Sequence, residues 1–291
     1  MKVIGYKLLL IPLIINLMFA SVSAAELEDK IEANKPLISI VVDDLGDNSI
    51  IARQLAQLPV PLTMAILPKT PHAYTIANLA NENGHEVIMH QPMEAFSRPD
   101  LLGPGAIFSD MEEQEVLDTI IENAETIPHL VGLNNHMGSL LTQDIKKMNQ
   151  VMQTVKARNW YFLDSKTNKE SQAESIASKW GVPAVGRDIF LDHHTQSEKI
   201  ELEKILLRRL EQAKNIAHQY GKVVVICHPY PETFSFLAKK LPELKSNFNF
   251  VKISELIDNK KVSFKNIAKI TKEKVNNSPT IQQNSTSILS Q

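Results

Sequence analysis

Two adjacent carboxylates, Asp43 and Asp44, are the side chains of this sequence best placed for chemistry. They directly follow an apolar, β-branched run at 37–42 and precede Leu45-Gly46. Such a run predicts a strand that is buried on both faces. Two carboxylates at its end repel each other and lose hydration, which costs free energy. Such a pair is expected where it binds a metal ion or takes part in a proton transfer. The alternative is a plain turn in which Asp44 caps the next helix.

Imidazole and carboxylate side chains recur where later apolar runs end. They are His90, Glu94, His136, Asp164, Asp188, Asp192 and His228. Because the carboxyl ends of parallel strands meet at one face of a sheet, these side chains are expected to converge. Imidazole and carboxylate ligands suit Zn²⁺, and catalytic zinc sites commonly keep one position open for water. The pattern predicts a zinc site, and the alternative for each histidine is a hydrogen-bonded structural role.

The elements that must position these residues alternate between apolar runs and helical stretches. Strands are expected at 37–42, 62–67, 86–90, 130–133, 160–163, 182–186, 222–227 and 248–252. Helices are expected at 48–57, 72–83, 111–126, 143–157, 171–180, 197–220 and 232–240. Repeated strand–helix–strand units predict parallel pairing. Seven or eight such units favour an α/β fold that closes into a distorted (β/α) barrel of parallel strands.

The two ends of the chain differ from the region between them. Residues 1–25 have a basic start, a short apolar core and small residues at 21–25, which is typical of a signal peptide. We expect a linker at 26–35, one domain at 36–260 and a disordered polar tail at 261–291. The protein is thus expected to be exported to the periplasm of a Gram-negative bacterium. The alternative is that the segment at 1–25 stays uncleaved as an anchor. No membrane span is expected in the mature chain, and the tail is a candidate contact for other envelope proteins.

The charge and composition of the chain narrow the classes of partner that it is expected to bind. The formal net charge is −2, which gives no electrostatic case for nucleic acid as a partner. The hydrophobic content of 43% is normal for a globular protein with a full core. The only cysteine, Cys227, cannot form an internal disulfide and lies in an apolar strand, so it is expected to be an inert core residue.

These motifs resemble those of polysaccharide deacetylases, specifically the divergent branch of bacterial envelopes, over residues 36–257. The wider family has an Asp-Asp-Gly turn after its first strand, in which the first Asp acts as base and the second binds metal. Asp43 and Asp44 match this turn, with Leu45 inserted before Gly46. The resemblance implies a NodB-like deacetylase fold.

The wider family next carries a His-x-x-x-His metal pair. His90 matches its first histidine, and Glu94 stands where the second should be. The divergent branch is expected to supply the missing histidine from His136. The resemblance therefore implies that Asp44, His90 and His136 hold Zn²⁺ or another divalent metal. Glu94 is expected to be either a fourth ligand or a partner that orients His90.

The later motifs of the family contain the residue that acts as the catalytic acid and a residue that orients the catalytic groups. His228 fits the place of the histidine that acts as the acid in a Leu-x-His motif. Segment 187–192 resembles a motif around an Asp that orients the catalytic base or histidine. Asp188 and Asp192 are both candidates for that Asp, and the sequence does not choose between them.

The resemblance implies hydrolysis of an N-acetyl group on an envelope glycan, which is the expected partner. Asp43 would take a proton from the attacking water and His228 would give one to the leaving amine. A glycan-binding envelope protein without turnover is one alternative, which the changed His-x-x-x-Glu pair favours. A metal-dependent hydrolase of another amide or ester is a second, because a fold does not fix the bond that is cleaved.

Overall fold

The computed structural model describes residues 35–193 and 201–258. The predicted signal peptide at 1–25 and tail at 261–291 lie outside the described residues, as does the linker apart from Lys35. Within the described ranges, no helix has the length and apolar character needed to cross a membrane.

The described chain alternates strands and helices. The strands are β1 (Leu37–Leu45), β2 (Thr63–Ile66), β3 (Glu86–Met93), β4 (Leu130–Met137), β5 (Tyr161–Asp164), β6 (Ala184–Gly186), β7 (Ile189–Phe190), β8 (Lys222–Cys227) and β9 (Asn249–Phe250). The α-helices are α2 (Ser49–Leu55), α3 (Ala73–Glu82), α4 (Glu113–Glu125), α5 (Ile145–Ala157), α6 (Ala173–Trp180), α7 (Leu202–Tyr220) and α8 (Pro231–Leu244). Two short 3-10 helices are η1 (Pro99–Leu101) and η2 (Leu141–Gln143).

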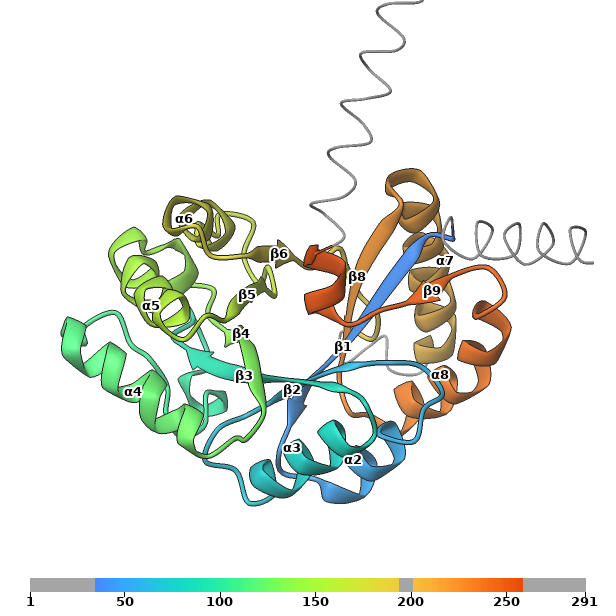
Figure 1. Cartoon of the computed structure of the whole chain (residues 1–291), viewed down its shortest axis with the longest axis horizontal. Coiled ribbons are helices and arrows are strands. Elements are labelled where there is room, and N and C mark those ends of the chain that lie inside the picture. Colours follow the sequence, from blue (N-terminus) through green and yellow to red (C-terminus); the bar gives the residue numbers. More distant parts are fainter. Residues whose placement is uncertain (1–34, 194–200, 259–291) are drawn as a thin grey trace, which may run out of the picture.

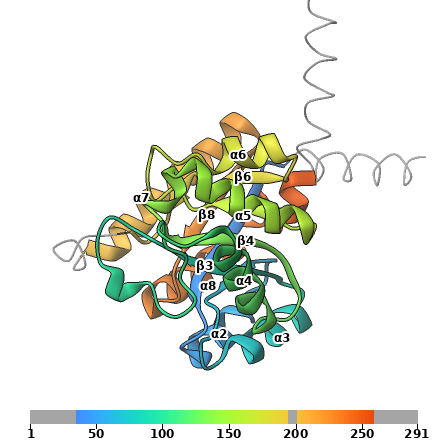
Figure 2. The ribbon, with the colours of Figure 1, turned by 90° about the vertical axis from the view of Figure 1, so that its left-hand side faces the viewer.

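The strands form one sheet in the order β6-β5-β4-β3-β2-β1-β8-β7, with β9 also beside β1. Every pairing is parallel. The two ends of the sheet, β6 and β7, are successive pieces of one segment, which pairs first with β5 and then with β8. The helices surround this curved sheet (Figure 1), and α4, α5 and α6 cover one side of it (Figure 2). The predicted distorted (β/α) barrel of parallel strands is confirmed.

Two apolar layers hold the strands in place. The larger packs between the sheet and its helices, and the smaller gathers residues from six strands around Ile253, Leu256 and Ile257. The carboxylate of Glu86, at the start of β3, is buried next to this smaller cluster. It accepts hydrogen bonds from the Tyr161 hydroxyl (2.7 Å) and from the backbone of Ser254 (3.3 Å). The segment at 253–257 therefore fills the barrel at the amino ends of its strands and leaves the carboxyl ends for a site.

Three strands run farther than the sequence predicts. β1, β3 and β4 were expected to end at 42, 90 and 133, yet they reach Leu45, Met93 and Met137. The polar ends of β3 and β4 stay in the ladder because they pair with each other: His90 lies opposite Asn134 and Pro92 lies opposite His136. The end of β1 pairs with β2 instead, where Leu45 lies opposite Ile66. Apolar patterning marks the buried part of a strand and misses a polar end that is still hydrogen-bonded.

Candidate active site

A bulge at the end of β1 turns both of its carboxylates toward β3. The register with β2 shifts between Val42 and Leu45, and Asp44 has a φ of +55°. On a regular strand, adjacent side chains point to opposite faces. Here the Nε2 atom of His90 lies 3.7 Å from Asp43 Oδ2 and 3.1 Å from Asp44 Oδ1. The left-handed conformation is sparsely populated by non-glycine residues, although Asp adopts it more readily than most.

The glycine after this bulge lets the next loop approach closely. Gly46 has a φ of +140°, and a Cβ atom there would clash with the hydroxyl of Thr70. Helix α2 begins after Asn48, whose side chain accepts hydrogen bonds from the backbone of Ile50 and Ile51. The alternative that Asp44 caps this helix is therefore wrong, and its carboxylate is available to the site.

Three ligand-type atoms converge at the carboxyl ends of β1, β3 and β4. Asp44, His90 and His136 each offer one atom, and these atoms lie within 4.8 Å of one another. Asp44 Oδ1 lies 3.1 Å from His90 Nε2 and 3.0 Å from His136 Nδ1. The two ring nitrogens are 3.2 Å apart. The structure therefore brings together the three residues that the resemblance implied as metal ligands.

Hydrogen bonds behind the two rings fix which nitrogen faces the cluster. His136 Nε2 lies 3.1 Å from the carbonyl oxygen of Leu101, which can only accept, so this nitrogen carries the hydrogen. Asn134 donates to Asp43 Oδ1 at 2.8 Å, which turns its own oxygen toward His90 Nδ1, also at 2.8 Å. His90 therefore donates from Nδ1, and each ring in its neutral form presents a lone pair to Asp44.

This donor set fits a cation. Two ring lone pairs and a carboxylate oxygen face one another, and Asp44 Oδ1 is buried with no hydrogen-bond partner of good geometry among the described residues. Burial opposes ionisation of Asp44, yet the rings of His136 and His90 outweigh it and hold its pKa far below the usual range. Burial also opposes a proton on His90, but Asp43 and Asp44 raise its pKa. The same carboxylates would favour a metal ion.

Asp43 stands beside the cluster as a separate carboxylate. It is buried, and burial raises its pKa, although His90 and His228 nearby work against that rise. Its Oδ1 accepts the hydrogen bond from Asn134, which leaves Oδ2 facing His90. A carboxylate whose pKa moves toward neutrality is suited to accept a proton from water.

His228, which follows β8, forms a close pair with Asp192. Its Nδ1 lies 2.8 Å from Asp192 Oδ1, while Nε2 is 4.0 Å from Asp44 Oδ2. Asp192 Oδ2 also accepts hydrogen bonds from the His228 backbone (2.7 Å) and from Thr233 (2.9 Å). Burial lowers the pKa of His228, but Asp192 above all, with Asp44 and Asp43, raises it to about 9. The imidazolium is therefore favoured at neutral pH, with Nε2 directed at the cluster.

Three sequence-predicted residues lie outside this arrangement. Asp164 accepts hydrogen bonds from the backbone of Lys166 at 2.8 Å and from the hydroxyl of Ser171 at 2.7 Å. The carboxylate of Asp188 accepts a hydrogen bond from the backbone of Val224 at 2.8 Å and belongs to the β7–β8 edge. Glu94 accepts one from the backbone of Ser109 at 2.7 Å, and it is not among the clustered ligand atoms of the described chain. The expectation that Glu94 orients His90 is wrong, because Asn134 does so. Of the two Asp candidates, Asp192 is the one that contacts His228.

Asn134 is the contributor that the sequence reasoning missed. It joins His90 to Asp43 and also donates to the Ser165 hydroxyl at 3.1 Å. A signal was present, because Asn134 and His136 are two residues apart on a strand and must share a face.

The fold and the cluster define a class: a parallel (β/α) barrel with a three-residue candidate metal site at the carboxyl ends of its strands. The chain belongs to the divergent polysaccharide deacetylases, whose family profile matches residues 40–257. This match confirms the resemblance that the motifs suggested.

Similar proteins cover most of the chain. The uncharacterized protein YibQ of Escherichia coli K12 is 32% identical over 225 residues, which are 77% of this chain and 68% of YibQ. An uncharacterized protein of Haemophilus influenzae is 29% identical over 77% of this chain and 78% of its own length. The crystal structure of the uncharacterized protein ATU2773 from Agrobacterium tumefaciens C58 superimposes with a TM-score of 0.71 at 22% identity. That match covers 77% of this chain and 89% of the other and shows the same fold.

Proposed function

We propose that this protein removes N-acetyl groups from an envelope polysaccharide or a peptidoglycan-type glycan, in a reaction that depends on Zn²⁺. The observation that carries the proposal is the cluster of Asp44, His90 and His136, with Asp43 on one side and the His228–Asp192 pair on another. Membership of the deacetylase family supports the chemistry. The predicted signal peptide supports a location in the periplasm.

Asp44, His90 and His136 would hold the metal. Two imidazoles and one carboxylate are a donor set that suits catalytic zinc. When bound, the metal supplies Lewis acidity, which polarises a carbonyl group and makes water easier to deprotonate.

The other residues of the site would move protons. Water attacks the acetyl carbon, and Asp43 accepts its proton because the Asp43 pKa is raised by burial. The C–N bond then breaks, which releases acetate. His228, held as imidazolium by Asp192, gives its Nε2 proton to the leaving amine. Asn134 holds Asp43 and His90 in position for these steps.

Acetate release from N-acetylglucosamine oligomers and from peptidoglycan strands tests this proposal. The zinc-loaded protein is expected to release acetate, and the variants Asp43→Asn and His228→Gln are each expected to lose about 100-fold or more in kcat. Asp188→Asn is the matched control, because the Asp188 carboxylate bonds to the backbone of Val224 at the β7–β8 edge. Binding of these glycans without acetate release would contradict the proposal and favour a glycan-binding role.

A further inference from the structure

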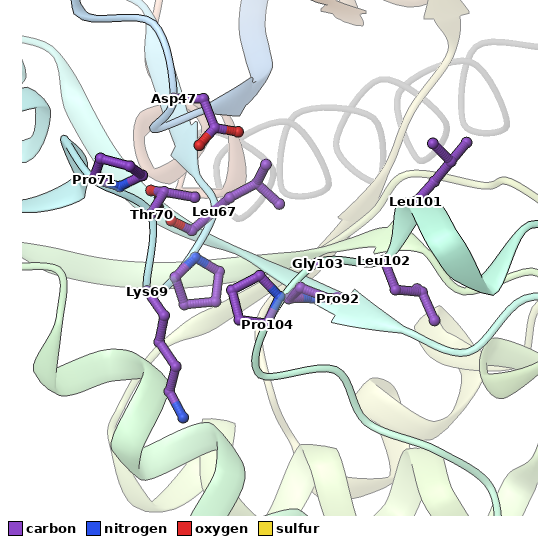
Figure 3. Close-up of a pocket in the computed structure, with 11 residues that line it drawn as sticks. Asp47, Leu67, Lys69, Thr70, Pro71, Pro92, Leu101, Leu102, Gly103 and Pro104 are labelled. Atoms are coloured by element: carbon purple, nitrogen blue, oxygen red, sulfur yellow. Dashed lines mark hydrogen bonds between the residues drawn. The ribbon is translucent and has the colours of Figure 1, made fainter.

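A pocket outside the metal-ligand cluster opens next to it. Its volume is about 260 Å³, and its walls come from the β1–α2 loop, the β2–α3 loop and the segment around η1. Proline rings and leucine side chains form much of the surface, including Leu67, Pro71, Pro92, Leu102 and Pro104 (Figure 3). Mostly apolar concave surfaces with a few polar groups are typical of ligand sites.

Each wall of this pocket is joined to one residue of the metal cluster. Asp47, on the first wall, comes three residues after Asp44. Pro92 comes two residues after His90 on β3 and shares its face of the strand. Leu101 lines the pocket and accepts the hydrogen bond of His136 through its carbonyl oxygen. A molecule in the pocket would therefore extend directly from the metal site.

Hydrogen bonds preform the wall that the β2–α3 loop contributes to the pocket. The backbone N–H groups of Leu67 and His72 donate to the carbonyls of Leu45 and Gly46 at 2.7 and 2.9 Å, which fixes the β2–α3 loop against the end of β1. The hydroxyl of Thr70 closes that loop by donating to the carbonyl of Leu67 at 2.8 Å. A preformed site loses little conformational entropy on binding.

The charge of the pocket favours neutral or cationic ligands. The carboxylate of Asp47 meets no hydrogen-bonding or ionic partner in the part of the chain that the structure describes. Lys69 also lines the pocket, but its ammonium group pairs with Glu122 at 3.2 Å, and its side chain extends away from Asp47 (Figure 3). The group left to meet a ligand is an acceptor, and hydroxyl groups are donors that fit it.

Exposed apolar side chains lie beyond the pocket. Ile50 and Tyr74 are 73% and 67% exposed, each in the first turn of the helix that follows a wall loop. The ring of Tyr74 and the aliphatic side chain of Ile50 offer apolar contact surfaces to a chain that continues past the pocket.

We propose that this pocket binds the sugar ring adjacent to the one that carries the scissile acetyl group, with Asp47 accepting hydrogen bonds from the hydroxyls of that ring. The apolar walls match the C–H faces of a pyranose, and the position next to Leu101 and Pro92 matches a neighbouring unit of the same glycan. This inference rests on the proposed function, and it makes the substrate an oligomer rather than a single sugar.

Binding of the tetramer of N-acetylglucosamine to the metal-free protein tests the proposal apart from catalysis. In amide NMR spectra, the tetramer is expected to shift the signals of Thr70 and Gly103. Asp47→Ala is expected to weaken binding about tenfold, because it removes a charged acceptor, and Asp47→Asn is expected to weaken it less. Asp118→Ala, on the surface of α4, is the matched control and is expected to bind like the unmodified protein.

The outcomes separate this inference from the proposed function. Unshifted Thr70 and Gly103 signals, or unchanged affinity in Asp47→Ala, would overturn the pocket assignment even if acetate is released. Shifts at both amides that weaken in Asp47→Ala, together with acetate release that rises with oligomer length, would support it. Such shifts without acetate release from any substrate would overturn the proposed function and leave glycan binding at the pocket standing.

Discussion

The pairing of Asp192 with His228 predicts a large change in the titration of one histidine. In the native site, burial lowers the pKa of His228, but the carboxylate of Asp192, assisted by Asp44 and Asp43, raises it to about 9. Asp192→Asn removes the strongest of these charges and preserves the shape of the side chain. The His228 pKa is then expected to return to about 6.5 or below. This fall of at least about two pKa units corresponds to about 3 kcal/mol less stabilisation of the imidazolium.

NMR titration of the histidine ring signals measures this change directly. The metal-free protein should be used, because a bound cation would cancel the contribution of Asp44. His228→Gln identifies the His228 signal among the nine histidines of the chain. Asp188→Asn is the matched control, because its carboxylate bonds to the backbone of Val224 and should leave the His228 pKa near 9. Equal titration of His228 in the native protein and in Asp192→Asn would refute the reasoning.

Three further perturbations test other parts of the structure. Gly46→Ala should destabilise the fold by roughly 1–3 kcal/mol more than Gly84→Ala in urea unfolding. Both glycines have a positive φ, but only at Gly46 would the added Cβ atom clash with a neighbour, Thr70; equal losses of stability in the two variants would contradict this. Burial lowers the pKa of His85, so the contribution of neutral His85 to the free energy of unfolding is complete above about pH 6.5 and falls as the pH drops below that value. His85→Asn should therefore make the free energy of unfolding depend less on pH below about 6.5, and an unchanged dependence would count against this. Asn134→Ala should weaken zinc affinity about 10- to 100-fold in competition titrations, because it removes the hydrogen bond that orients His90 through Nδ1. A variant that binds zinc as tightly as the native protein would contradict this role of Asn134.

Much of the fold could be predicted because apolar patterning follows burial. The alternation of runs such as 37–42 and 222–227 with helical stretches predicts parallel pairing, and the register of β1 with β8 covers those same residues. The short strand β7 was missed, because two residues are too few to show a period.

The site could be predicted only where position along a strand decides it. Residues at the carboxyl ends of parallel strands, such as His90 and His136, must converge in any parallel barrel. The adjacent carboxylates of Asp43 and Asp44 reach one site because of a left-handed bulge. Strand periodicity does not predict this, and only the resemblance to the Asp-Asp-Gly turn implied it. The contacts of side chains in loops are harder still to predict from sequence. Glu94, for example, accepts a hydrogen bond from the backbone of Ser109 instead of joining the cluster.

The choice between Asp188 and Asp192 shows the same limit. Both acidic residues lie in one short segment, and their spacing of four residues gives no indication of which one faces His228. The pairing of β7 with β8 decides it, since that ladder places Asp188 beside Val224. Asp192 then lies just beyond the ladder, where its carboxylate contacts both the ring and the backbone of His228.

The metal content of the purified protein tests the central claim most directly. Zinc is supplied at neutral pH, excess metal is removed, and the bound metal is measured by mass spectrometry. About one zinc ion per chain is expected in the native protein, and it should be lost in Asp44→Ala, His90→Ala and His136→Ala. Asp188→Asn is expected to retain it. No bound zinc in the native protein, or full zinc content in the His136 variant, would contradict the assigned metal site.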